Sequence, residues 1–88
     1  MKLNSEFILQ EIGGDALLVP VGKSAEAFHG LIRLNETAAF LVKKLQKESS
    51  TEALIKALSE EYEGTAEQFE KSVETTLSKL REAGALIE

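Results

Sequence analysis

The placement of chain-breaking residues limits the possible folds of this chain more than any other feature. The only proline and most of the glycines lie within the first 30 residues, together with the sequence that favours strands. Beyond residue 35, apolar residues recur at helical spacing with few breaks. Strands followed by helices are typical of an α+β domain. Because 88 residues are enough for one core and too few for two, we expect a single domain over residues 1–88.

A β-hairpin is predicted near the N-terminus. The apolar runs 7–12 and 16–21 flank Gly13-Gly14-Asp15, in which glycine permits the positive φ of a short turn. Pro20 has no N–H to donate to a neighbouring strand. We therefore expect Pro20 at a strand end or on an unpaired edge.

A third strand is predicted over residues 28–34, after a polar segment, 23–27, that is expected to be a loop. Successive side chains of a strand point to opposite faces. The predicted core face consists of Phe28, Gly30, Ile32 and Leu34, and the opposite face of His29, Leu31 and Arg33. This strand would complete a three-stranded antiparallel sheet.

Three amphipathic helices are predicted to follow the sheet, ending near residues 47, 62 and 83. The expected N-caps are Asn35, either Ser49 or Ser50, and Thr65. The expected buried stripes are Ala38, Leu41, Val42 and Leu45; then Leu54, Ile55, Leu58 and Tyr62; and then Phe69, Val73, Leu77 and Leu80. Gly84 is a typical helix stop, and the apolar tail after it is expected to pack back onto the domain.

The residue types needed for catalysis or metal binding are scarce. The chain contains no cysteine and a single histidine, His29, which has no sequence neighbour to orient it. There is no glycine-rich phosphate loop and no Gly-x-Ser-x-Gly elbow, and the many glutamates decorate the polar sides of helices. We therefore expect no catalytic residues, no metal site and no cofactor.

The charge pattern and the absence of targeting signals limit the partners. The net charge is −5, and residues 51–88 hold nine acidic and four basic side chains, so phosphate backbones should bind poorly. The N-terminus lacks the apolar stretch of a signal peptide, and no run of eighteen apolar residues occurs. We expect a cytoplasmic protein with no membrane or nucleic-acid partner.

The third strand is the first candidate binding surface. A sheet of three strands that does not close leaves unpaired backbone groups at its edges. The third strand has no proline and only one charge, Arg33, beside the aliphatic Leu31 and Ile32. A peptide could add to this edge as a further strand.

The third helix offers a possible wall beside this edge. Its residues Ser72, Thr76, Lys79 and Ala83 recur at helical spacing. They form either a surface that a peptide backbone can approach or an ordinary helix shoulder.

A second candidate surface involves the first helix. Phe40 lies opposite the expected buried stripe and close in sequence to Lys43, Lys44 and Lys47. An aromatic side chain among lysines could receive an acidic, amphipathic ligand. Alternatively, Phe40 folds over the sheet and the lysines form a solvated face.

The sequence resembles the PqqD family. The resemblance rests on the hairpin, on the segment 30–41 (GLIRLNETAAFL), on the segment 50–55 (STEALI) and on the segment 80–86 (LREAGAL). A strand ending in Leu-Asn-x-Thr that leads directly into a helix is the most characteristic of these features. The matching segments cover essentially the whole chain in order and spacing.

The resemblance implies a winged-helix-like fold with three strands followed by three helices, and no activity of its own. It implies a RiPP recognition element, a peptide chaperone that binds the leader of a ribosomally synthesised precursor peptide as an added strand and presents it to a modifying enzyme, often a radical SAM protein. The peptide-binding residues expected here are His29, Leu31, Ile32, Arg33, Phe40, Lys44, Ser72, Thr76 and Lys79. Val42 and Ala38 stand where many relatives carry tryptophan and glycine, which bears on core packing and on the pathway served.

Two other classes of function remain open from the sequence. Winged helices commonly bind DNA, although the third helix here carries Glu67, Glu70, Glu74 and Glu82 and the hairpin tip is Gly-Gly-Asp. A self-associating module, a monomer or weak homodimer that pairs through edge strands, could coexist with peptide binding and would compete with it.

Overall fold

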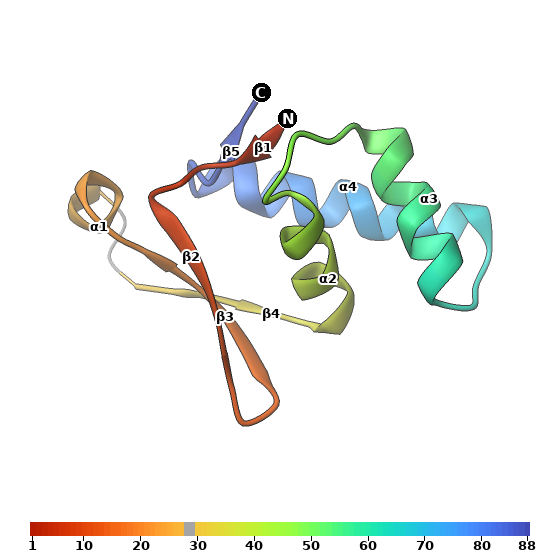
Figure 1. The fold of residues 1–88 in the computed structure, drawn as a ribbon, viewed down its shortest axis with the longest axis horizontal. Helices are drawn as coiled ribbons and strands as arrows, with labels where there is room; N and C mark the ends of the chain where they lie inside the picture. The colour runs from red at the N-terminus through yellow and green to blue at the C-terminus, as the bar shows by residue number, and fades with distance from the viewer. Residues whose placement is uncertain (28–29) are drawn as a thin grey trace.

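The computed structural model describes residues 1–27 and 30–88. The elements in chain order are β1 (Lys2–Leu3), β2 (Phe7–Ile12), β3 (Asp15–Pro20), α1 (Lys23–Ala27), β4 (Ile32–Leu34), α2 (Glu36–Lys44), α3 (Thr51–Glu61), α4 (Ala66–Glu82) and β5 (Leu86–Ile87). An antiparallel sheet has the order β2-β3-β4, and a second sheet pairs β1 with β5. The hairpin of β2 and β3 projects at one end of the molecule, and the chain termini lie at the other (Figure 1). The α+β class with a three-stranded antiparallel sheet is confirmed.

The predicted hairpin is confirmed, with a tighter turn than expected. Ile12 pairs with Asp15, so only two glycines connect the strands and Asp15 belongs to β3. Gly13 and Gly14 have φ values of 59° and 107°, and positive φ at both positions is what a two-residue turn of this twist requires. Pro20 ends β3, as predicted, and this places a residue without an N–H at the end of the central strand.

The third strand is shorter than predicted. β4 covers only Ile32–Leu34, which pairs with Leu18 through Ala16 of β3. Within β4 the expected alternation holds, since Leu34 is buried, Ile32 is half-buried and Arg33 is exposed. Gly30 has a φ of 135°, a conformation outside the extended range of a strand, which accounts for the late start. The predicted strand residues Phe28 and His29 lie outside the described residues.

The short helix α1 replaces the loop expected over residues 23–27. The carboxylate of Glu6 accepts hydrogen bonds from the backbone N–H of Lys23 at 3.3 Å and from the hydroxyl of Ser24 at 3.0 Å. These bonds satisfy donors at the beginning of the helix. Because the acceptor lies 17 residues earlier in the chain, the local sequence gave no sign of it.

The three long helices begin at side-chain caps, as predicted. The Asn35 side chain accepts from the Ala38 N–H at 2.8 Å, and Ser50 rather than Ser49 caps α3. Thr65 and Gln68 form a reciprocal capping box at the start of α4. The helix α2 ends at Lys44, three residues earlier than expected, and the backbone bonds donated by Gln46 and Lys47 are long, at 3.4 Å.

The predicted buried stripes form one core between the sheet and the helices. α2 contacts the sheet, α3 and α4, and α3 contacts α4. Members of all three stripes are fully buried together with the sheet residue Leu18: Leu41, Val42, Leu45, Leu54, Leu58, Val73 and Leu80. Ile55, Tyr62 and Phe69 are only partly buried and pack at the margin of this core. Burial of each large aliphatic side chain contributes about 1.5–3 kcal/mol, so these positions dominate the packing energy.

The chain ends are joined to each other and to the helical core. After α4, the N–H groups of Gly84 and Ala85 bond to the carbonyls of Arg81 and Leu80, and Gly84 has a φ of 75°. This Schellman motif turns the chain back and buries Ala85 completely. β5 then pairs with β1, with Ile87 opposite Lys2. The expectation that the tail packs on the domain is confirmed.

Candidate functional site

Two hollows that share Lys79 in their lining lie along the helix α4, one beside the strand β4 and one beside the beginning of α2. In the described part of the chain β4 pairs only with β3, so its other edge has no strand beside it. The apolar part of the groove is lined by Ile32, Lys79, Glu82 and Ala83. The polar part is lined by Asn35, Thr37, Ala38, Gln68, Lys71, Ser72, Thr75, Thr76 and Lys79. We call the two hollows together the β4–α4 groove, and we call them its apolar and polar parts.

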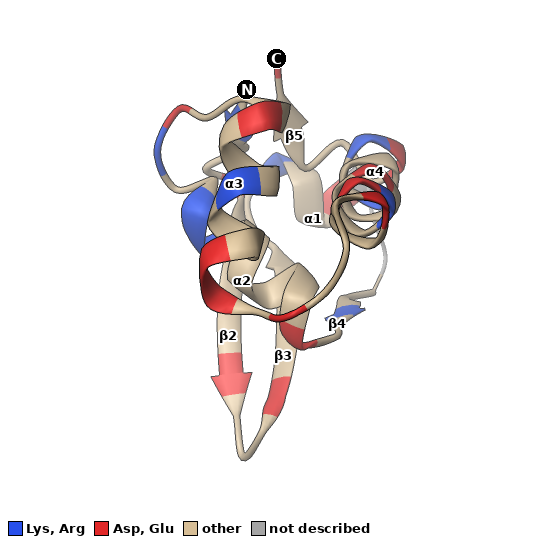
Figure 2. Cartoon of the chain, turned by 90° about the vertical axis from the view of Figure 1, so that its right-hand side faces the viewer, with Lys and Arg blue, Asp and Glu red and all other residues tan. Residues whose placement is uncertain are grey.

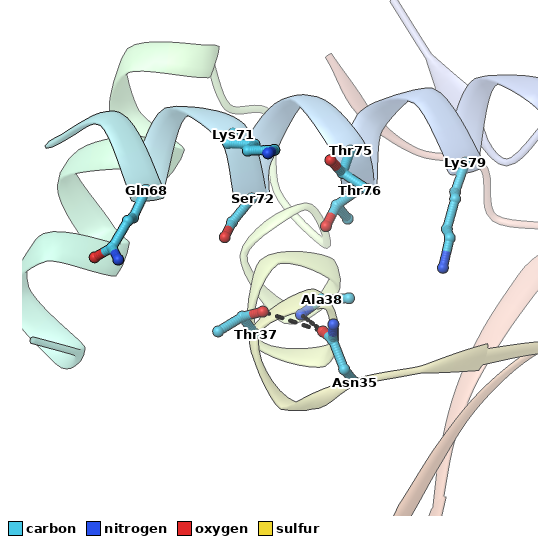
Figure 3. A pocket seen from close by; sticks show the side chains of 9 residues that line it. All are labelled: Asn35, Thr37, Ala38, Gln68, Lys71, Ser72, Thr75, Thr76 and Lys79. Atoms are coloured by element: carbon cyan, nitrogen blue, oxygen red, sulfur yellow. Dashed lines mark hydrogen bonds between the residues drawn. The ribbon is translucent and has the colours of Figure 1, made fainter. Parts of the chain in front are cut away.

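The wall of the groove is one face of α4. Residues three or four apart lie on the same side of a helix, and the α4 residues of the polar lining follow this spacing from Gln68 to Lys79. The side chains of Ser72, Thr76 and Lys79 extend from α4 toward the junction of β4 and α2 (Figure 3). The neighbouring face of α4, with Val73, Leu77 and Leu80, is buried in the core. The hydrophobic anchor of α4 therefore fixes where these polar side chains point.

The opposite side of the polar part is the beginning of α2. The Asn35 side-chain oxygen accepts from both the Ala38 N–H at 2.8 Å and the Thr37 hydroxyl at 3.1 Å (Figure 3). These two bonds hold the end of β4 and the first turn of α2 in one orientation. The groove is about 320 Å³ in its polar part and about 360 Å³ in its apolar part.

The polar part of the groove is locally basic although the chain is acidic. Lys71 and Lys79 are exposed, and neither forms an ion pair with any described residue. The carboxylate in the groove lining, Glu82, lies in the apolar part at the other end. The net charge of −5 therefore does not describe this surface.

The structure brings together four of the nine predicted binding residues. Ile32, Ser72, Thr76 and Lys79 all line the groove, and Ala83 of the same predicted helix face joins them. Arg33 is exposed and points to the opposite side of the sheet from Ile32, by the alternation of the strand. Leu31 is exposed and precedes β4. His29 lies outside the described residues.

The structure separates Phe40 and Lys44 from the groove. The ring of Phe40 meets Tyr62 edge-on, with centroids 5.6 Å apart, and the Lys44 Nζ lies 5.2 Å from the Phe40 centroid. The surrounding hollow is lined by Glu11, Gly13, Gly14, Asp15, Ala16, Leu34, Glu36, Ala39, Phe40, Lys43, Glu61 and Tyr62. We call it the α2–hairpin hollow. Phe40 is partly buried and packs against the core margin, beside Tyr62 of α3 and with Lys44 over its ring.

The α2–hairpin hollow differs from the groove in its charge. Four carboxylates line it, and its one lining lysine, Lys43, binds Glu11 at 2.8 Å. Acidic residues lie near the hairpin tip on both β2 and β3 (Figure 2). The lysines near Phe40 in the sequence therefore do not make this region basic.

The hollow also changes the titration of Tyr62. Partial burial raises the pKa of Tyr62, and its hydrogen bond with Glu36 raises the pKa further.

Several groove residues were missed from the sequence. Lys71, Gln68 and Thr75 lie on the same face of α4 as the predicted residues, and the same helical spacing identifies them. Asn35 was predicted only as a helix cap, and Thr37 only as part of the Leu-Asn-x-Thr segment, yet both form the wall opposite α4. That second role depends on how α2 and α4 pack, which the local sequence does not show.

Two further observations limit other assignments. Within residues 1–27 and 30–88, aspartates and glutamates do not gather in groups of three or more that could hold a metal ion. No helix in these same ranges combines the length and apolar character needed to cross a membrane.

Comparisons with known proteins agree on one fold. The chain superposes with a TM-score of 0.77 on the structure of TbiB1 in complex with the TbiA(beta) leader peptide, at 16% identity, over 98% of this chain and 94% of that one. It superposes with a TM-score of 0.76 on a lasso peptide synthetase B1 complexed with the leader peptide, at 22% identity, over 99% and 96%. No curated protein sequence matches the chain significantly.

The match to a family is direct. The model of the family described as coenzyme PQQ synthesis protein D matches residues 7–86. This range begins with the first residue of the hairpin and ends in β5, so it includes every element that borders the groove. The chain therefore belongs to the PqqD family.

Proposed function

We propose that this chain is a non-catalytic binding protein that captures the leader segment of a ribosomally synthesised precursor peptide and presents it to a modifying enzyme. The observation that carries the proposal is the unpaired edge of β4 beside a groove walled by α4. An extended peptide adds to such an edge through backbone hydrogen bonds, and its alternate side chains enter the groove. The backbone bonds supply affinity, and the groove lining supplies selectivity.

Presentation needs no chemistry from this chain. A disordered leader loses conformational entropy when it becomes a strand, and the rigid sheet and helix supply the contacts that offset this loss. Once the leader is bound, the segment to be modified stays close to the enzyme. Its effective concentration then reaches about the millimolar range for a short flexible connection.

Family membership and the fold comparisons support the proposal. The chain belongs to the PqqD family, and both similar solved structures are complexes with a leader peptide. The expected partners are a precursor peptide and a tailoring enzyme in the cytoplasm, with a radical SAM protein as the first candidate. The reading frames beside the gene would identify both partners, since a short peptide gene next to a tailoring enzyme is the expected arrangement.

Binding and its location can be tested together. A synthetic leader from the neighbouring peptide gene is titrated into the ¹⁵N-labelled protein, and calorimetry measures the affinity. We expect backbone amide shifts concentrated in β4 and in the groove face of α4, and smaller shifts in α3. Absence of binding, or shifts confined to the α2–hairpin hollow, would overturn the proposal.

The two rival functions have their own measurements. Fluorescence anisotropy with duplex DNA at physiological salt would detect nucleic-acid binding, which we expect to be absent because α4 exposes Glu67, Glu70 and Glu74. Sedimentation at several concentrations, with and without leader, would detect pairing through edge strands. A dimer that dissociates when the leader is added would show that the two processes compete for β4.

A further inference from the structure

We infer that the β4–α4 groove selects a leader segment in which an acidic residue is followed four positions later by a large apolar residue. The inference rests on the proposed function and concerns the sequence that this particular groove takes. It follows from three features: the different chemistry of the two parts, the distance between them, and the direction in which a strand adds to β4.

The two parts of the groove suit different side chains. Lys71 and Lys79 border the polar part with the hydroxyls of Ser72 and Thr75, and neither lysine is paired with a carboxylate of the described residues. A carboxylate placed there would accept charge-assisted hydrogen bonds from ammonium and hydroxyl donors. This part is therefore complementary to aspartate or glutamate.

The second part offers a mainly apolar surface, and the exposed Glu82 lines it as well. Ile32 is half-buried at the edge of β4, and Ala83 is half-buried at the end of α4. The methylene stem of Lys79 lies between the two parts, so its ammonium can serve the acidic residue while its stem covers an apolar one. A leucine, isoleucine, valine or phenylalanine fits this position.

The positions of the two parts along α4 set the spacing between the acidic and the apolar residue of the peptide. The α4 residues that line the polar part centre near residue 73, and those that line the apolar part centre near residue 81. Eight residues of helix at about 1.5 Å each separate the centres by about 12 Å. A strand covers that length in about four residues at about 3.3 Å each. Positions i and i+4 of a strand also face the same side, so both side chains can enter the groove.

The order of the two residues follows from strand direction. β4 runs from Ile32, at the apolar part, toward Asn35, at the polar part. Antiparallel pairs outnumber parallel ones and have the more favourable hydrogen-bond geometry. A peptide antiparallel to β4 enters at the polar part and leaves past Ile32. Its acidic residue therefore precedes its apolar residue.

A random-peptide selection tests the inference without knowledge of the natural precursor. Dodecapeptides with all residue types at each position are selected by mRNA display against the folded protein, and groove binders are identified by their loss of binding to the Ser72→Arg variant, whose long side chain fills the polar part. We expect enrichment of Asp or Glu followed at the fourth position after it by a large apolar residue. Peptides that bind the groove without this pair, or with the reverse order, overturn the inference and leave the proposed function intact. Failure to select any groove-binding peptide overturns both.

Charge reversal separates a true contact from a general preference for acidic peptides. The double variant Lys71→Glu and Lys79→Glu should bind the selected peptide about tenfold more weakly, and replacement of the peptide's acid by lysine should restore binding. Lys56→Glu, at an exposed position on α3 outside the groove, is the matched control and should change affinity less than twofold. Equal weakening by the control and no rescue by the lysine peptide would overturn the assignment of the acid to the polar part.

Discussion

The β4–α4 groove and the α2–hairpin hollow lie on different sides of α2 and have opposite charge. The groove contains one carboxylate, Glu82, and two lysines without ion-pair partners in the described chain, whereas the hollow contains four carboxylates and one lysine that is already paired. In the sequence the lysines are densest around Phe40, next to the hollow. The comparison shows that the local charge of a small domain depends on which faces its helices bury, and only weakly on how charges cluster along the chain.

The largest expected loss of leader-binding affinity comes from a substitution that fills the groove and leaves the hollow unchanged. Ser72→Arg places a long side chain in the polar part and should weaken leader binding by more than about tenfold, because the strand can no longer approach α4. Calorimetry with the leader measures the loss. Ser59→Arg is the matched control, since Ser59 is exposed on α3 and outside the groove lining. Unimpaired binding by the Ser72 variant would place the leader elsewhere.

A smaller effect is expected from reversing one charge in each region. Lys79→Glu should weaken leader binding about fivefold and reduce its dependence on salt, because exposed charges at the rim mainly govern encounter. Lys44→Glu, which removes the cation over Phe40, should leave binding unchanged within about twofold. Titrations at two salt concentrations provide the measurement. Equal losses in both variants would show that the hollow also contacts the leader.

Arg33 should have a weaker effect than Lys79 because its side chain lies on the opposite side of β4 from the groove. We expect Arg33→Glu to slow association about twofold and to leave the dissociation rate unchanged. Stopped-flow fluorescence with a labelled leader separates the two rates. A large increase in dissociation rate would mean that Arg33 contacts the bound peptide directly.

The smallest expected effect concerns the hollow alone. The free energy of unfolding should depend on pH through the ionisation of Tyr62. Because the pKa of Tyr62 is raised in the folded chain, its contribution to stability is complete below the usual tyrosine pKa of about 10 and is lost as pH rises through the folded value. Tyr62→Phe should therefore flatten the alkaline decline in the free energy of unfolding. Urea denaturation between about pH 8 and pH 11 measures it. Identical alkaline slopes in the two proteins would contradict the assignment.

The groove wall was more predictable than the rest of the site. Ser72, Thr76 and Lys79 follow from helical spacing, because one turn of α4 fixes the side on which the next residue lies. The separation of Phe40 from them was not predictable, since it depends on the angle at which α2 packs against the sheet and α4. The same limit applies to α1, whose cap comes from Glu6, and to the pairing of β1 with β5 across the whole chain.

The pairing of β1 with β5 has a practical consequence for protein engineering. Because the first and last strands lie side by side and neither lines the groove, the two ends of this domain leave the molecule at one place. Such a unit can be spliced into a surface loop of a host enzyme with short linkers at both junctions. An enzyme fused to the domain in this way would carry its own binding site for substrates that bear the leader peptide.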